Sequence, residues 1–102
     1  MDGNTPVDGS STAGLYSPMG IDIFETDVVS VIIADEGNAR IVRLWDDGTN
    51  NRNVSVLATE RAPGQSLVDP YNVYVDVKNG PNLYVTDAGY NFNGQVILYS
   101  NI

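Results

Sequence analysis

Carboxylates are the first group of side chains in this chain that could do chemistry. Asp22 and Asp76 stand in segments whose alternating pattern predicts strands. If copies of these strands surround an axis, the two carboxylates line a channel and offer the oxygen ligands that a hard cation such as calcium prefers. The alternative is that both are solvated carboxylates at strand ends. We therefore name Asp22 and Asp76 as candidate calcium ligands and expect no other cofactor.

Two further aspartates occupy corresponding places in the chain. Asp35 and Asp87 each follow an apolar segment, and a glycine stands two positions after each of them. Arranged around a channel, they would be a second candidate site for a cation. An aspartate in such a place also accepts hydrogen bonds from the backbone N–H groups of its own turn. We favour this structural role for both residues.

Aromatic rings beside amide side chains form the second group. Such rings stack on sugars or hold a peptide, and loops at the ends of strands commonly carry binding residues. The competing interpretation is that the rings pack between sheets, which we expect for Trp45, Tyr74 and Tyr84. The predicted ligand-binding residues are Tyr71, Asn72, Tyr90, Asn91, Phe92 and Asn93.

The composition limits the classes of function. The 102 residues include 5 Lys and Arg against 13 Asp and Glu, a net charge of −8, which repels the phosphates of nucleic acids and of anionic membranes. There is no Cys and no His, so thiol catalysis, imidazole base chemistry and Cys/His zinc sites are excluded. We expect a protein that is not an enzyme and that binds neither nucleic acid nor membrane.

The sequence predicts no compartment. No apolar run approaches the roughly 20 residues of a membrane span, and Met1–Pro6 lacks the basic and apolar regions of a signal peptide.

Strands must position these side chains, and they come in two similar units. Leu15–Gly37 recurs as Leu67–Gly89, 52 positions later. Alternation and β-branched runs predict strands, no capping signal leads into a helical period, and Arg61–Ser66 is expected to be a loop. The predicted strands are Gly20–Glu25, Val28–Ala34, Arg40–Trp45, Asn53–Thr59, Asn72–Val77, Asn82–Thr86 and Gln95–Tyr99.

A strand-rich repeat of this length is typical of propeller blades. We predict an all-β fold with two four-stranded blades per chain, in which residues 15–66 form blade 1 and residues 67–102 supply three strands of blade 2. Residues 1–14 align with the outer strand of unit one, so we expect them to be the outer strand of a neighbouring chain's blade. Because two blades cannot close a ring, the chain must then assemble with copies of itself.

The spacing of proline, glycine and apolar residues ahead of an Asp-x-Gly-Asn-x-Arg turn resembles the NHL repeat over roughly residues 15–100. The second copy departs after Gly89, where Tyr90–Gly94 makes a longer turn and Gln95 stands in place of the arginine. The matching residues of the first copy are Pro18, Gly20, Ile21, Ile23, Ala34, Asp35, Gly37, Asn38, Arg40 and Ile41. Those of the second are Pro70, Asn72, Val73, Val75, Asp76, Tyr84, Val85, Thr86, Asp87, Gly89 and Val96.

This resemblance implies four-stranded blades, usually six to a ring, so that homotrimerisation would complete a six-bladed β-propeller. Members of the family bind ligands, proteins or RNA, and some are lyases or lactonases. The rival WD type fits Trp45-Asp46 but requires a Gly-His pair, which this chain lacks.

We therefore expect a non-enzymatic oligomeric β-propeller that serves as a binding or assembly module for a protein, peptide or carbohydrate. One alternative is a lactonase-like hydrolase or lyase that uses a divalent metal bound in the channel. Another is a fragment or engineered building block without a ligand. Met1 and the complete two-unit frame favour a whole protein over a fragment.

Overall fold

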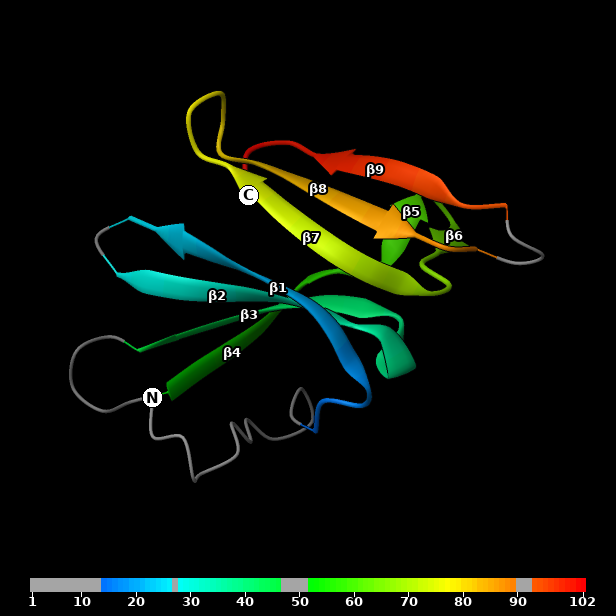
Figure 1. Ribbon diagram of the computed structural model, residues 1–102, viewed down its shortest axis with the longest axis horizontal. Coiled ribbons are helices and arrows are strands. Elements are labelled where there is room, and N and C mark those ends of the chain that lie inside the picture. Colours follow the sequence, from blue (N-terminus) through cyan, green and yellow to red (C-terminus); the bar gives the residue numbers. More distant parts are fainter. Residues whose placement is uncertain (1–13, 27, 47–51, 90–92) are drawn as a thin grey trace.

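The computed structural model describes residues 14–26, 28–46, 52–89 and 93–102, and over these ranges the protein is all-β. The first of its three antiparallel sheets is a meander in which each strand pairs with the next one along the chain (Figure 1). One 3-10 turn, η2 (Glu36–Asn38), joins its second and third strands. The strands of this first sheet are β1 (Pro18–Glu25), β2 (Val29–Asp35), β3 (Arg40–Asp46) and β4 (Arg52–Ala58).

The second unit of the repeat forms a separate three-stranded meander, called here the second sheet. Its strands are β7 (Pro70–Asp76), β8 (Asn82–Asp87) and β9 (Gln95–Tyr99). The connection between the sheets contains a small hairpin of β5 (Glu60–Ala62) and β6 (Gln65–Ser66). The prediction of a plain loop at Arg61–Ser66 is therefore wrong. Pro63 and Gly64 supply the turn of this hairpin, and Gly64 has a positive φ of 76°.

The strands otherwise lie where the alternation predicts them, and cross-strand partners share a face. Ile21 pairs with Ile33, and Asp22 pairs with Ile32. The β-branched run of β2 is buried almost throughout, as a strand covered on both sides must be, with Val29 as its exposed end.

The two sheets lie side by side and bury one face each against the other (Figure 1). The resulting core joins residues from both units of the repeat and includes Leu67 from the connection. Burying these side chains is the main stabilising contribution to the fold, at about 25 cal/mol per Å² of apolar surface. The core residues are Phe24, Ile32, Ala34, Ile41, Leu67, Val75, Leu83, Val85 and Ile97.

The first strands of the two sheets, β1 and β7, are direct neighbours. A Cβ atom at Gly20 would collide with the backbone carbonyl of Tyr71 and would lie 2.7 Å from the Cα atom of Asn72. Farther along, Asp22 Oδ2 accepts a hydrogen bond of 2.7 Å from the backbone N–H of Val75. A glycine and a carboxylate therefore hold the two inner strands together.

Over the described residues the four-stranded and three-stranded sheets lie next to each other and do not form a closed ring (Figure 1). No helix in these ranges is long and apolar enough to cross a membrane.

Candidate functional site

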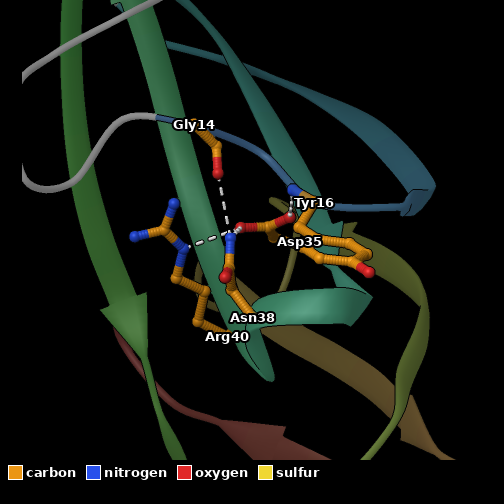
Figure 2. A network of polar contacts seen from close by, with 5 residues as sticks. All are labelled: Gly14, Tyr16, Asp35, Asn38 and Arg40. Carbon is orange, nitrogen blue, oxygen red and sulfur yellow. Dashed lines mark hydrogen bonds and ion pairs between the residues drawn. The ribbon is translucent and has the colours of Figure 1, made fainter.

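The carboxylate of Asp35 is fully buried at the end of β2 and is the centre of a polar network (Figure 2). Its Oδ1 accepts a hydrogen bond of 2.7 Å from the backbone N–H of Tyr16, which precedes β1. Its Oδ2 accepts from Asn38 Nδ2 at 2.8 Å and from Arg40 Nε at 2.7 Å. Asn38 also donates to the carbonyl oxygen of Gly14. Asp35 therefore ties the chain before β1 to the β2–β3 turn.

Asp87 does the same work in the second sheet with different donors. It is almost fully buried, and its carboxylate accepts from the backbone N–H groups of Val68 at 3.1 Å, Asp69 at 2.7 Å and Gly89 at 3.1 Å. Gln95 stands opposite Asp87, where Arg40 stands opposite Asp35 in the first sheet. Three backbone donors thus replace the asparagine and arginine of the first copy. The geometry agrees with the structural role favoured for both residues.

The candidate calcium ligands are also engaged with the backbone. Asp22 bridges two amides, because its Oδ1 accepts from Ile23 at 2.8 Å while its Oδ2 accepts from Val75. Asp76 closes the turn after β7 by accepting from the backbone N–H groups of Lys78 and Asn79. Over the described ranges no three acidic side chains gather as a metal would require. Calcium binding by Asp22 and Asp76 stays a prediction.

The predicted ligand-binding residues are only partly within the described structure. Tyr71 and Asn72 are exposed at the start of β7, and Asn93 is exposed just before β9. Tyr71 lines a shallow depression of about 320 Å³ at the end of the second sheet. Asn72 and Asn93 are not among its lining residues, and Tyr90, Asn91 and Phe92 lie outside the described residues. The depression is lined by Tyr71, Thr86, Asp87, Ala88, Gly94, Gln95 and Val96.

The side of the second sheet that points away from the first sheet is apolar and exposed, which corrects one expectation. Tyr74 and Tyr84 do not pack between the two sheets of one chain, since they are 63% and 37% exposed. Their rings lie 6.4 Å apart, and Leu98 pairs with Tyr84 on the same side. Trp45 is half-buried under the Arg43 guanidinium. We call this side of the sheet the second free face; its residues are Asn72, Tyr74, Tyr84, Thr86, Val96 and Leu98, with Asp76 and Asn82 at its end.

The first sheet also leaves an apolar side uncovered, along β1. Ile21 and Ile23 are 67% and 58% exposed, although isoleucine is among the residue types most often buried. Ile21 and Ile33 line a depression of about 250 Å³ together with Met19. We call the exposed strip along β1 the first free face. Its exposed residues are Ile21, Ile23 and Val29; toward β3 the same side is covered, since Val31 is half-buried and Ile33, Val42 and Leu44 are buried.

The outer strand β9 is tied to the connection between the sheets. The hydroxyl of Tyr99 donates a hydrogen bond of 2.6 Å to the carbonyl oxygen of Glu60. Burial raises the pKa of Tyr99 above its ordinary value of 10.0, and the negative charge of Asp87 raises it further. The phenol is therefore held neutral, which is the state that donates the bond.

Neither free face was singled out from the sequence, although the signal was present. Strand alternation places Ile21 and Ile23 on one side of β1, but it does not say whether the other sheet covers that side. The repeat identifies the equivalent positions in the second unit, and the structure shows which side they face. The residues 52 positions after Ile21 and Ile23 are Val73 and Val75, which face the core.

The geometry of the site is not accompanied by a family assignment. A scan against models of known protein families finds no match, and a search of curated proteins finds no significant relative. The resemblance to NHL repeats therefore depends on the motif residues alone.

Proposed function

We propose that this chain is a two-blade unit that assembles as a homotrimer into a six-bladed ring and serves as a binding or assembly module. The observation that carries the proposal is the pair of free faces. Each sheet buries one face in the core and leaves apolar side chains exposed on the other, along β1 in the first sheet and across β7, β8 and β9 in the second, as a blade does when its neighbour is missing. Copies of the chain would cover both faces and close the ring.

The use of the carboxylates supports a non-enzymatic role. Asp35 and Asp87, the buried acids of the described structure, each accept three hydrogen bonds from the chain itself. A general base or nucleophile needs lone pairs directed at a substrate, and these acids direct theirs at turns. With no His and no Cys in the sequence, the remaining chemistry is recognition.

Residues 1–14 complete this proposal, although all of them except Gly14 lie outside the described residues. The second sheet has three strands where the first has four, and the edge of β9 is where a fourth strand would pair. The first residues of a neighbouring copy align in sequence with β4 and would supply it. This exchange would also protect an edge that otherwise invites aggregation.

The ligand of such a ring would meet the turns around Tyr71, Asn72 and Asn93. An exposed ring beside amide groups suits a carbohydrate or a peptide, since the ring stacks and the amides donate and accept. The surface of the second sheet near Tyr71 has a shallow depression rather than a deep pocket. A broad, shallow contact fits a glycan or a peptide better than a small metabolite.

Light scattering of the whole chain tests the assembly. The expected mass is close to three times 11.0 kDa, and deletion of residues 2–10 should shift the protein toward smaller species. A folded monomer at micromolar concentration contradicts the ring. Assembly that is unchanged by the deletion contradicts the strand exchange alone.

A glycan array and a peptide array test the binding role. Signal that falls at least tenfold in Tyr71→Ala, Tyr90→Ala or Phe92→Ala, but not in the control Lys78→Ala at the other end of β7, supports the predicted surface. Signal that is equal in all four variants places the ligand elsewhere.

A further inference from the structure

The contact between the two sheets within one chain contains a template for the contact between copies. In this contact the first sheet presents Asp22, Ile32 and Ala34, and the second sheet presents Val75, Leu83 and Val85. A shift of 52 positions converts each of these two sets into residues of a free face. The side that one sheet buries in this contact is therefore equivalent, in the repeat, to the side that the other sheet leaves exposed.

The first free face has the same kind of side chains as the equivalent side of the second sheet, which is buried in the core. The residues 52 positions before Val73, Val75, Leu83 and Val85 are Ile21, Ile23, Val31 and Ile33. All eight are branched aliphatic residues. On the opposing side, Tyr84 and Thr86 stand where the core has Ile32 and Ala34, so this face is larger and carries hydroxyl groups.

The distribution of charge favours contact between copies at the free faces over contact elsewhere on the surface. Copies of a chain with a net charge of −8 repel one another. The central residues of both free faces are uncharged. Glu25, opposite Val29, lies at the end of the first face, and Asp76, opposite Asn82, lies at the end of the second. The centres of the free faces are therefore surfaces on which two copies can meet without bringing carboxylates together, and Glu25 and Asp76 meet only at one end of such a contact.

We infer that the second free face of one copy docks on the first free face of the next copy, in the register of the contact between the two sheets. This inference rests on the proposed ring and specifies its junction. Asp22 lies against Val75 within one chain, so the equivalent neighbours across the junction are Tyr74 of one copy and Ile23 of the next. The contact is head-to-tail, with different faces meeting, and such contacts close rings.

One position departs from the template. Gly20 allows β1 to approach the backbone of Tyr71 and Asn72 within the chain, but its counterpart 52 positions later is Asn72 itself. The side chain of Asn72 would lie against Met19 and Gly20 of the next copy. The inner strands at the junction between copies are therefore held farther apart than β1 and β7.

Disulfide cross-linking tests the register, because the chain has no cysteine of its own. The double variant Ile23→Cys/Tyr74→Cys, oxidised and run on a non-reducing denaturing gel, should give two-chain and three-chain bands that return to one chain on reduction. Each single variant should remain at the mass of one chain. The double variant Asp22→Cys/Val75→Cys, which places the same pair within one chain, is the matched control and should also remain there.

The outcomes separate the inference from the proposed ring. Dimers from either single variant show that like faces meet, which overturns the inference even if the protein is a trimer. No cross-linking of the Ile23/Tyr74 pair in a protein that light scattering shows to be trimeric also overturns it. A wild-type monomer overturns the proposed function instead.

A second measurement avoids cysteines. Tyr74→Glu and Ile23→Glu change exposed positions, so each variant should fold and lose assembly. Each retains one intact free face. Mixing the two monomeric variants should therefore restore a species of two chains and no larger one, because one head-to-tail junction can form while the others stay blocked. A mixture that remains monomeric contradicts head-to-tail docking.

Discussion

At the scale of single residues, two buried aspartates at equivalent positions of the repeat accept hydrogen bonds from different kinds of donor. Asp35 combines one backbone N–H with Asn38 and Arg40. Asp87 has glutamine opposite it and takes all three of its bonds from the backbone. A charge buried without partners costs several kcal/mol, so each copy must supply donors, and the two copies do so with different groups.

Asp87→Ala should lower the free energy of unfolding by about 3 kcal/mol or more, because it leaves three N–H groups without the acceptor that a carboxylate provides. Urea denaturation followed by circular dichroism measures this loss. The control Glu25→Ala, at an exposed position, should change stability by less than about 0.5 kcal/mol. A similar effect of both variants would contradict the structural role of Asp87.

The sequence located the aspartates but not all of their partners. Turn chemistry predicts a bond between Asp87 and Gly89, and the structure contains it. The bond from Tyr16 to Asp35 joins residues 19 positions apart. It depends on how the segment before β1 crosses the end of β2, and no local rule gives that path.

At the scale of the elements, the junction of β1 and β7 decides how the two sheets meet. Gly20 permits the close approach of these strands, and Asp22 bonds to an amide on each of them. The strands themselves follow from alternation, and the repeat predicts four strands in one unit and three in the other, as observed. Which face of each sheet is covered did not follow, because the alternation of β1 is equally consistent with either side.

Gly20→Ala should destabilise the protein by about 1–3 kcal/mol, since its methyl group would push into the Tyr71 backbone and separate the inner strands. Thermal denaturation measures this effect. Gly64→Ala is an instructive comparison, because nothing lies near a Cβ at Gly64 and its cost would come from the positive φ alone. A Gly20→Ala variant as stable as the wild type would show that the two sheets are not packed as described.

The bond between Tyr99 and Glu60 makes the position of β9 sensitive to alkali. The pKa of Tyr99 is raised in the folded state, so the neutral phenol stabilises the fold fully below the unfolded pKa of about 10. This stabilisation is lost as the pH rises through the folded pKa, because the unfolded chain then releases its proton first.

Unfolding in urea at pH 8 and at pH 11 measures the effect of alkali. The wild type should lose more stability across this range than Tyr99→Phe, which has no proton to release. At pH 8 the variant should be less stable by about 1 kcal/mol, the usual contribution of one hydrogen bond. Equal losses in both proteins would contradict the role of Tyr99.

At the scale of the whole molecule, a strongly acidic chain carries two free faces whose central residues are uncharged. The net charge of −8 repels copies at long range, while in the proposed ring the free faces would attract them at contact. These two effects differ in their response to salt, since ions screen the repulsion between charges beyond about 8 Å at physiological ionic strength and do not weaken apolar contacts.

Raising sodium chloride from 20 mM to 300 mM should therefore strengthen the association of copies, with a several-fold lower dissociation constant in sedimentation equilibrium. The opposite trend would indicate that ion pairs rather than apolar faces hold the copies together. Ile23→Glu provides the matched comparison, because its charge lies within the contact and salt should restore assembly only in part.

The glycine at position 20 has a final consequence for the order in which such a ring would come apart. Three seams would lie inside polypeptides and three between them, and only in the first kind is the residue that points at the neighbouring inner strand a glycine. The seams between polypeptides carry Asn72 at that point and must be wider. Warming should thus release intact single molecules first, with loss of β structure following at a higher temperature.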